Sequence, residues 1–252
     1  MMRKPYMTTS TVYRTKAENY ARYRWHYAQE ALDTLIAHAR LSRDAVVADI
    51  GAGTGILTMA LTRRFNTVFA VEPNAEMRFF AERDLTCTVI KGSGEATGLA
   101  SASVDLVTVA QALHWMEPVR TRAELRRILK PDGWLAIFHN NGVANEVGRA
   151  IGALYSAEYG FDPTYNNKRP PAKPLDFYFG HQNFVEHRFT FEQQSTREAF
   201  LGALGSAANS PAEDHPRYPA LVAAVDAIFD RYAVGGRLPS LAQTKLTVGQ
   251  PR

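Results

Sequence analysis

A glycine-rich stretch is the part of the sequence best suited to binding a ligand. It reads Asp49-Ile50-Gly51-Ala52-Gly53-Thr54-Gly55 and lies between the apolar run 45–50 and the apolar segment 56–61. Glycines let the backbone approach a ligand because they carry no Cβ, and a helix that begins behind them offers free N–H groups. In an open α/β sheet, the turn after a strand is where ligands bind.

Glu72 is the second residue that points to a ligand. It follows the apolar run 67–71, about 20 residues beyond the glycines, where a carboxylate can accept hydrogen bonds from both hydroxyls of a ribose. The glycine-rich stretch and this acid together predict an adenosine-containing ligand. The alternative is a structural turn between a strand and a helix, with an acid nearby by chance.

The spacing of the glycines separates the possible adenosine ligands. The dinucleotide pattern is G-x-G-x-x-G, whereas this loop is G-x-G-x-G, with Ile56 where the third dinucleotide glycine would fall. Asp49 precedes the first glycine by two residues; its charge disfavours a pyrophosphate and suits a ligand with an ammonium group and a sulfonium. No Gly-Lys-Ser/Thr follows, so the loop is not a phosphate-binding P-loop.

The elements that must position these residues alternate along the chain. Buried strands separated by helices predict an open parallel sheet, because parallel neighbours need crossover connections. Two late strands, with no second core expected, extend the same sheet. We expect strands over 45–50, 67–71, 86–90, 104–109, 134–138, 184–192 and 241–248, and helices over 17–39 (one or two), 56–61, 74–84, 118–129, 143–159, 196–205 and 217–234.

Composition and charge exclude several classes of protein. The 252 residues are 46% hydrophobic and 21% charged, as in a globular protein, which excludes disorder, collagen and coiled coil. A net charge of +4, with basic residues in ones and twos, argues against a nucleic-acid partner.

Location and metal binding are also addressed by the sequence. The sequence has no run of 18 apolar residues, as a membrane span would need, and no apolar stretch behind the polar N-terminus, as a secretory signal would need. We therefore expect no membrane partner and a cytoplasmic location. The single cysteine, Cys87, fits a reducing compartment, and no metal site is expected.

Five motifs in register carry a resemblance to a known family. They are Val47 to Gly55, Val71 to Met77, Gly92 to Ala96, Val104 to Trp115 and Leu129 to Gly133. In order and spacing they resemble the class I S-adenosylmethionine-dependent methyltransferases, and more narrowly the small-molecule group with a methyltransferase type 11 domain, to which the trans-aconitate methyltransferases are related. The resemblance extends to 20–24 and, more faintly, to 206–211, so it covers nearly the whole chain.

This resemblance implies a fold and a division of the chain. The fold is α/β, a Rossmann-like seven-stranded sheet of order 3-2-1-4-5-7-6 flanked by helices. An N-terminal helical lid would cover residues 1–40 and a class I methyltransferase domain 41–252, with 140–182 as an insertion on the substrate side. The implied cofactor is S-adenosylmethionine, converted to S-adenosylhomocysteine, with no metal.

The family's cofactor contacts carry over onto matching positions of this sequence. Ser93 departs from the family, in which many members have an acid that bonds the adenine amino group. We therefore expect adenine binding to rely on backbone contacts and packing. The implied contacts are Asp49, Gly51 and Gly53 for the methionine part, Glu72 for the ribose, Pro73, Asn74, Ser93 and Gly94 for the adenine, and Gln111 for the methionyl portion. Ala52 and Glu95 are implied as further cofactor-binding residues.

The reaction expected is a single in-line displacement, for which the protein must align a nucleophile and exclude water. We expect a small-molecule acceptor methylated at oxygen, as a carboxylate or hydroxyl, ahead of nitrogen or carbon. A hydroxyl needs a proton acceptor, and His114 is either that base or a packing and positioning residue. A base role predicts an acid limb in the pH profile near pH 6 to 7. Trp115 is expected as a pocket wall.

The family's lid and acceptor positions are also matched in part. Tyr20, Tyr23 and Arg24 match the lid, whereas Arg24-Trp25-His26-Tyr27-Ala28 replaces the family's Arg-Pro-x-Tyr-Pro. Ser206 and Asn209 fall near the acceptor, Asn209 in place of a common aromatic. Removal of residues 1–27 is expected to leave the sheet folded and to abolish transfer.

The remaining expectations concern the pocket wall and the partners. The aromatic-rich loop 160–182 is expected as a variable wall, with Lys168 and Arg169 as solvated charges. The expected state is a monomer or homodimer. The competing function is a non-catalytic S-adenosylmethionine-binding sensor or partner protein.

Overall fold

A computed structural model of the chain describes residues 9–252, with side chains from residue 15 on. The first eight residues of the expected lid segment 1–40 lie outside the described residues. The strands are β1 (Val46–Ile50), β2 (Thr67–Val71), β3 (Thr88–Ile90), β4 (Val104–Ala110), β5 (Leu129–Gly142), β6 (Val185–Thr196) and β7 (Arg237–Gly249).

These strands form one seven-stranded sheet of order β3-β2-β1-β4-β5-β7-β6, which confirms the order that the resemblance implied. β1 pairs in parallel with β2 and β4, and the parallel pairing continues to β3 on one side and β5 on the other. β5 and β7 are antiparallel. The carboxyl ends of β1, β2 and β4 therefore meet at one edge of the sheet.

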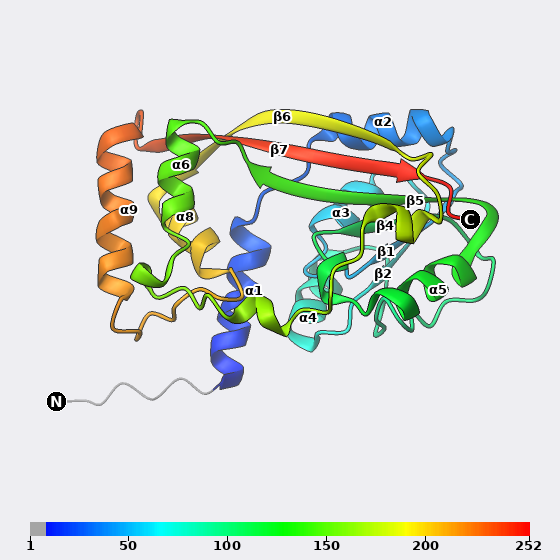
Figure 1. Cartoon of the computed structure of the whole chain (residues 1–252), viewed down its shortest axis with the longest axis horizontal. Coiled ribbons are helices and arrows are strands. Elements are labelled where there is room, and N and C mark those ends of the chain that lie inside the picture. The colour runs from blue at the N-terminus through cyan, green and yellow to red at the C-terminus, as the bar shows by residue number, and fades with distance from the viewer. Residues whose placement is uncertain (1–8) are drawn as a thin grey trace. The chain divides into compact units, whose positions relative to one another are not determined.

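Helices connect the strands along the chain (Figure 1). Three short 3-10 turns, η1 (Leu113–Trp115), η2 (Ala157–Tyr159) and η3 (Tyr165–Lys168), complete the described elements. The helices are α1 (Thr9–Tyr23), α2 (Gln29–Ala39), α3 (Ile56–Thr62), α4 (Ala75–Asp84), α5 (Pro118–Ile128), α6 (Glu146–Ala153), α7 (Leu175–Phe179), α8 (Arg197–Gly205) and α9 (Tyr218–Tyr232).

The described chain divides into two compact units. The sheet unit contains Trp25–Val143, Asn167–Phe191 and Ala242–Arg252, and the helical unit contains the residues up to Arg24, Ala144–Asn166 and Glu192–Leu241. The expected boundary between lid and methyltransferase domain, at residue 40, lies inside the sheet unit. Compact units do not show function, so the functional division of the chain stays a prediction.

The sheet unit buries apolar side chains on both faces of its strands. α2 and α3 cover one face, where Leu32, Leu35 and Leu61 pack with Phe138 of β5. α5 and α7 cover the other, where Leu125, Ile128 and Phe179 pack with Ile137 of β5. Alternate residues of β5 thus serve the two layers, as the two-residue period of a strand requires. The strands of the sheet unit therefore lie between two layers of packed helices.

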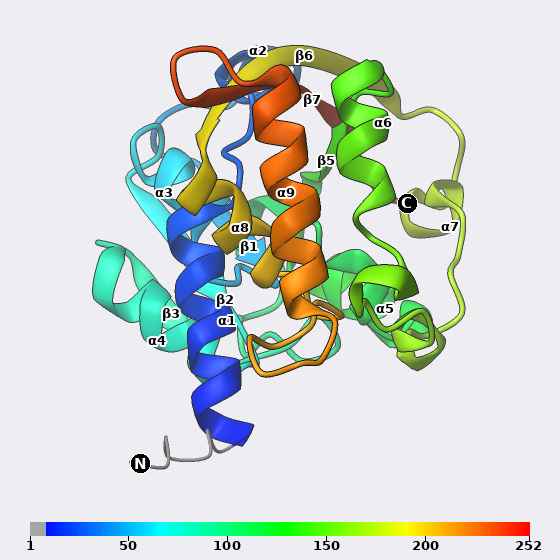
Figure 2. The same ribbon diagram turned by 90° about the vertical axis from the view of Figure 1, so that its left-hand side faces the viewer.

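The helical unit has a hydrophobic core of its own, so the expectation of a single core is wrong. α1, α6, α8 and α9 lie side by side in Figure 2, and the cluster includes Leu154, Phe200 and Val225. Amphipathic helices bury their apolar stripes against one another, which can form a core without a sheet. The sequence gives no sign that two distant segments, 144–166 and 192–241, pack against each other.

Most expected elements are present, with differences in extent. The helical segment 17–39 is two helices, α1 and α2. The expected helix 143–159 is shortened to α6, because Asn145 caps its start through the Gly148 N–H and two glycines within it weaken helix formation. The loop 160–182 contains α7, which buries Tyr178 and Phe179 and ends at Gly180 with φ +76°. β5 and β7 run longer than expected because they pair through Gly142 and Ala242.

Among the described helices, none is long and apolar enough to cross a membrane.

Candidate active site

The glycine loop after β1 is held by the end of β2. The N–H groups of Gly51 and Ala52 both donate to the carbonyl of Val71, at 2.9 and 3.1 Å. Gly51 and Gly53 have φ of +71° and +60°, in the left-handed region that favours glycine. A Cβ on Gly53 would meet nothing within 4 Å, so the loop has open space in front of it at that residue.

Glu72 joins the loop to the next helix. Its buried carboxylate accepts from the Gly53 N–H through Oε2 and from the Asn74 N–H through Oε1, both at 2.8 Å. Burial raises the pKa of this carboxyl, whereas the two backbone hydrogen bonds and the charge of Arg78 lower it. Glu72, the expected hydrogen-bond acceptor for the ribose hydroxyls, therefore lies beside the loop and is oriented by two backbone N–H donors.

Asp49 lies below the loop and is 1% exposed. Its two oxygens accept from the hydroxyls of Thr58, at 2.6 Å, and Thr108, at 2.8 Å. Burial raises the pKa of Asp49 to about 6, although both threonine hydrogen bonds work in the other direction. Through these two hydrogen bonds Asp49, at the end of β1, connects to α3 and β4, and the contacts stabilise the start of the glycine loop.

The expected adenine contacts form a tight turn beside the loop. Ser93 and Ala96 exchange backbone hydrogen bonds, and Glu95 Oε1 accepts from the Glu117 N–H at 2.6 Å. A Cβ on Gly94 would lie 2.4 Å from Sδ of Met116, and one on Gly51 would lie 2.9 Å from Cε of the same methionine. Met116 therefore packs between the glycine loop and this turn.

Pro73 and Asn74 lie between Glu72 and α4, and both are exposed. The Asn74 side chain caps α4 by accepting from the Met77 N–H at 2.9 Å. An adenine contact by this side chain would compete with the cap, so its backbone is the freer contact.

Gln111, at the end of β4, has φ +54°, which is unusual for a residue other than glycine. Its Nε2 donates to the Asn140 carbonyl at 2.7 Å, and its Oε1 lies 3.2 Å from Nδ1 of His139. Burial, followed by the charge of Lys245, lowers the pKa of His139. Gln111 thus brings the ends of β4 and β5 together in a backbone conformation of the kind that concentrates at functional sites.

His114 lies in η1, directly after β4 and Gln111. Burial lowers its pKa to about 4, with smaller contributions in the same direction from the charges of Arg169 and His139. The imidazole is consequently neutral near pH 7, and the acid limb expected near pH 6 to 7 is corrected to near pH 4. A group with so low a pKa is a weak proton acceptor.

Arg169 is not the solvated charge that the sequence suggested. Its guanidinium lies 4.6 Å from the centroid of the Trp115 ring, and its Nε is buried without a hydrogen-bond partner among the described residues. The stacking holds the guanidinium against an indole that is itself 41% exposed. Trp115 thus supports a cation beside His114, whereas its expected role as a pocket wall stays a prediction.

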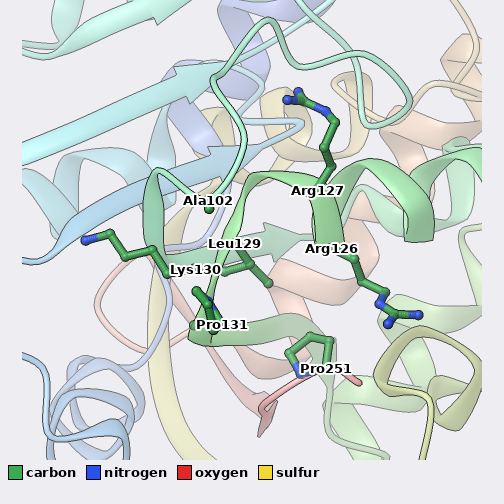
Figure 3. Close-up of a pocket in the computed structure, with 8 residues that line it drawn as sticks. Ala102, Arg126, Arg127, Leu129, Lys130, Pro131 and Pro251 are labelled. Carbon is green, nitrogen blue, oxygen red and sulfur yellow. The ribbon is translucent and has the colours of Figure 1, made fainter.

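A cavity of about 160 Å³ opens next to His114. It is lined by His139 and Met116, and by Pro170, Lys173 and Tyr178 of the loop expected as the variable wall. A larger cavity, about 330 Å³, lies at the other end of the sheet, where Ala102 precedes β4 and Arg126 lies in the last turn of α5 (Figure 3). Ligands of α/β sheets bind at the carboxyl ends of strands, so the smaller cavity is the functional candidate.

The helical unit brings three of the expected lid and acceptor residues together. Arg24 Nε donates to Ser206 Oγ at 2.7 Å, and the guanidinium lies 5.0 Å from the Tyr20 ring centroid. The Tyr23 hydroxyl instead donates to Glu198 at 2.7 Å. Asn209 lies apart from this group, where its carbonyl accepts from the Asp162 N–H at 3.0 Å.

Two residues near these positions have roles that the sequence did not indicate. Tyr27 is buried in the sheet unit and packs edge-on against Phe138, at 5.6 Å between ring centroids. Removal of residues 1–27 would therefore damage the sheet's core, contrary to expectation. The ammonium of Lys16 donates to the carbonyls of Ala207, Ala208 and Ser210, at 3.0 to 3.3 Å.

Sequence reasoning missed Met116, His139 and Arg169 at the site. His139 had a usable signal, because it follows the buried run 134–138 and the ends of parallel strands gather at one edge. The sequence contains no comparable signal for Arg169 or Met116. Their roles depend on a loop and a 3-10 turn whose paths no periodic pattern describes.

Comparisons with known proteins agree with this geometry. Residues 48–137 match the family model for the type 11 methyltransferase domain. An uncharacterized methyltransferase of Mycobacterium tuberculosis is 40% identical over 139 residues, 53% of this chain and 56% of that protein. An uncharacterized methyltransferase of Schizosaccharomyces pombe is 29% identical over 132 residues, covering 51% of this chain and 52% of that one. The chain thus spans about half the length of these curated relatives.

Solved structures share the fold over most of the chain. A protein provisionally named a type II methyltransferase, from Anaeromyxobacter dehalogenans, covers 91% of this chain with a TM-score of 0.64 and 23% identity, over 99% of its own length. The YcgJ protein from Bacillus subtilis covers 89% with a TM-score of 0.55 and 18% identity, also over 99% of its length. At these identities the likeness concerns the fold. Residues 48–137 thus match a methyltransferase domain, and they lie in a sheet that has the strand order of a Rossmann-like methyltransferase fold.

Proposed function

We propose that this protein transfers a methyl group from S-adenosylmethionine to an oxygen of a small molecule. The observation that carries the proposal is the Glu72 carboxylate, bonded to the Gly53 N–H beside a loop with open space in front of it. These residues fit an adenosine, since a buried carboxylate suits ribose hydroxyls and the glycines permit close approach.

The cofactor contacts proposed are the loop residues Gly51 to Gly53, Glu72 and the turn 93–95. The cofactor supplies a methyl carbon activated by a sulfonium. The open side of Gly53 lets the loop backbone approach it, and Asp49 keeps that backbone in place through Thr58 and Thr108. A loop fixed before binding loses little conformational entropy when the ligand arrives.

The acceptor is proposed to enter the cavity beside His114. Met116 lines this cavity and packs against Gly51 and Gly94, so it borders both parts of the site. A neutral His114 orients the acceptor by hydrogen bonding, and the apolar walls keep water away from it. Because the imidazole is a weak base, a carboxylate oxygen suits this site better than an alcohol that must lose a proton.

The other expectations from the sequence stay proposals: a cytoplasmic monomer or homodimer, and a lid role for Tyr20, Tyr23 and Arg24. Methylation at nitrogen or carbon remains the alternative chemistry. A non-catalytic sensor that binds the cofactor remains the alternative from another class.

Methyl transfer to a panel of small acceptors tests the proposal. Purified protein is incubated with methyl-labelled S-adenosylmethionine and carboxylates, phenols or amines. We expect labelled product with at least one oxygen acceptor, and a reduced yield with Glu72→Ala. Glu82→Ala, which changes an exposed acid of α4, is the matched control and should transfer normally. Cofactor binding without product from any acceptor class would favour the sensor, and labelling of transfer RNA or protein alone would contradict a small acceptor.

A further inference from the structure

The cavity beside His114 has an unbalanced charge. Among the described residues that line it, none is an aspartate or glutamate, whereas Lys173 lines it and Arg169 directly precedes the lining residue Pro170. Glu117 lies between the lining residues Met116 and Pro118, but its carboxylate caps α5 by accepting from the N–H groups of Val119 and Arg120. Neither Lys173 nor Arg169 forms an ion pair with another described residue. Cations gathered at an apolar cavity without acids favour an anionic occupant.

Arg169 lies beside this cavity without lining it, held against Trp115 rather than extended into solvent. Its guanidinium stacks on Trp115, and its Nε is buried without a hydrogen-bond partner among the described residues. A buried donor without an acceptor is costly, and a carboxylate oxygen could satisfy it. Arg169 also lies close enough to His114 for its charge to act on that imidazole.

The remaining walls determine the shape of the occupant. The rings of Pro170, Pro171 and Tyr178 line the cavity, and Lys173 Nζ lies 5.7 Å from the Phe177 ring centroid. Guanidinium groups bind carboxylates in a planar, bidentate geometry, which Arg favours over Lys. Flat apolar walls next to a stacked guanidinium suit a planar acid.

We infer that the cavity beside His114 is a carboxylate-recognition site, in which Arg169, assisted by Lys173, binds the carboxylate of a planar organic acid whose ring or unsaturated chain packs on Pro170, Pro171 and Tyr178. The inference rests on the proposed function, because it names the class of acceptor for the same site. It adds Arg169 as the residue that selects the acceptor.

Benzoate and its neutral counterpart benzamide are suitable probes. Each is titrated by NMR into the full chain, with and without S-adenosylhomocysteine, and the imidazole signal of His114 is followed after assignment with His114→Gln. We expect benzoate to shift this signal and to raise the pKa of His114, because an anion offsets the charge of Arg169. Benzamide should bind at least tenfold more weakly.

Two variants locate the interaction. Arg169→Gln should weaken benzoate at least tenfold and, without any probe, raise the pKa of His114. Arg126→Gln, which changes an exposed arginine at the other end of the sheet, should leave both quantities as in the wild type. Lys173→Gln should weaken benzoate less than Arg169→Gln does. If Arg169→Gln does not fold, Arg169→Lys and the benzoate–benzamide comparison on the wild type still decide the matter.

Several results would overturn the inference. They are equal binding of benzoate and benzamide, no binding of benzoate at millimolar concentration, or benzoate binding unaffected in folded Arg169→Gln. Calorimetry with S-adenosylhomocysteine on the same samples separates this failure from that of the proposed function. Heat from the nucleoside without benzoate binding contradicts only the acceptor class, whereas absent heat with intact benzoate binding contradicts the cofactor.

Discussion

The backbone N–H of Gly53 donates to Oε2 of Glu72 at 2.8 Å, across 19 residues of sequence. The same carboxylate accepts from the Asn74 N–H through its other oxygen. Glu72 therefore has two roles in this account, since it holds the glycine loop and would receive the ribose hydroxyls. A binding surface shaped by one buried carboxylate is sensitive to any change in that residue.

Glu72→Ala is expected to weaken binding of S-adenosylhomocysteine by about 1–3 kcal/mol, or roughly fivefold to 150-fold, because ribose hydroxyls and the Gly53 N–H lose their acceptor. Isothermal titration calorimetry measures this change. The control Glu82→Ala removes an exposed carboxylate that lies 3.4 Å from the largely buried Arg78, and it should alter affinity by less than a factor of about 2. Equal effects of the two variants would show that Glu72 acts only through folding or net charge.

Gly51 and Gly53 offer a matched pair of substitutions. Both have positive φ, but a Cβ on Gly51 would lie 2.5 Å from the Cβ of Ala112, whereas one on Gly53 would meet nothing. Gly53→Ala should cost about 1–2 kcal/mol of stability through backbone strain, and should weaken the cofactor by entering its space. Gly51→Ala should destabilise further, by about 1–3 kcal/mol of overpacking.

Urea unfolding and calorimetry on both glycine variants separate the effects. A Gly53→Ala protein that binds the cofactor normally would mean that the open space in front of the loop is not the binding site.

Asp49 should make stability depend on pH. Its pKa is raised from 3.8 to about 6 in the folded state, so the folded protein holds this proton more tightly than the unfolded chain. Its contribution is therefore complete below about pH 4 and is lost as pH rises to about 6, a change of about 3 kcal/mol. Asp49→Asn should remove this part of the slope in urea unfolding at pH 4, 5, 6 and 7. An unchanged slope would contradict the assignment to Asp49.

Because of the low pKa of His114, the rate of methyl transfer should change little through this residue between pH 5 and 7. Because burial lowers its pKa to about 4, the imidazole is neutral over that range and its protonation reduces activity only near pH 4. As a positioning residue, His114→Gln should lower kcat by less than about tenfold on a carboxylate acceptor. A loss of about 10²–10⁴-fold, with removal of an acid limb, would instead establish a general base.

The sheet unit could be predicted from sequence because its signals are local. Apolar runs such as 46–50 and 67–71 end at glycines or an acid, which places Gly51 and Glu72 at one edge of a parallel sheet. The helical unit could not be predicted, since its core joins Leu154 and Phe200 with Val225 across long gaps in the chain. Periodicity shows that a helix has an apolar face but not which other helix covers it.

The acceptor side of the site was less predictable than the cofactor side. Gly53 and Glu72 are recognised from spacing alone, but Arg169 comes from a loop crowded with proline, where no repeating pattern fixes the path. Its stacking on Trp115 is a tertiary contact between side chains far apart in sequence. The pKa of His114 likewise depends on burial and on that arginine.

Titration calorimetry with S-adenosylhomocysteine tests the central claim most directly. We expect binding with a micromolar dissociation constant, about −8 kcal/mol, and weaker binding by Glu72→Ala. A nicotinamide dinucleotide should release no heat, since the loop has Ile56 where the third dinucleotide glycine belongs. Heat from the dinucleotide and none from either S-adenosyl nucleoside would contradict the account.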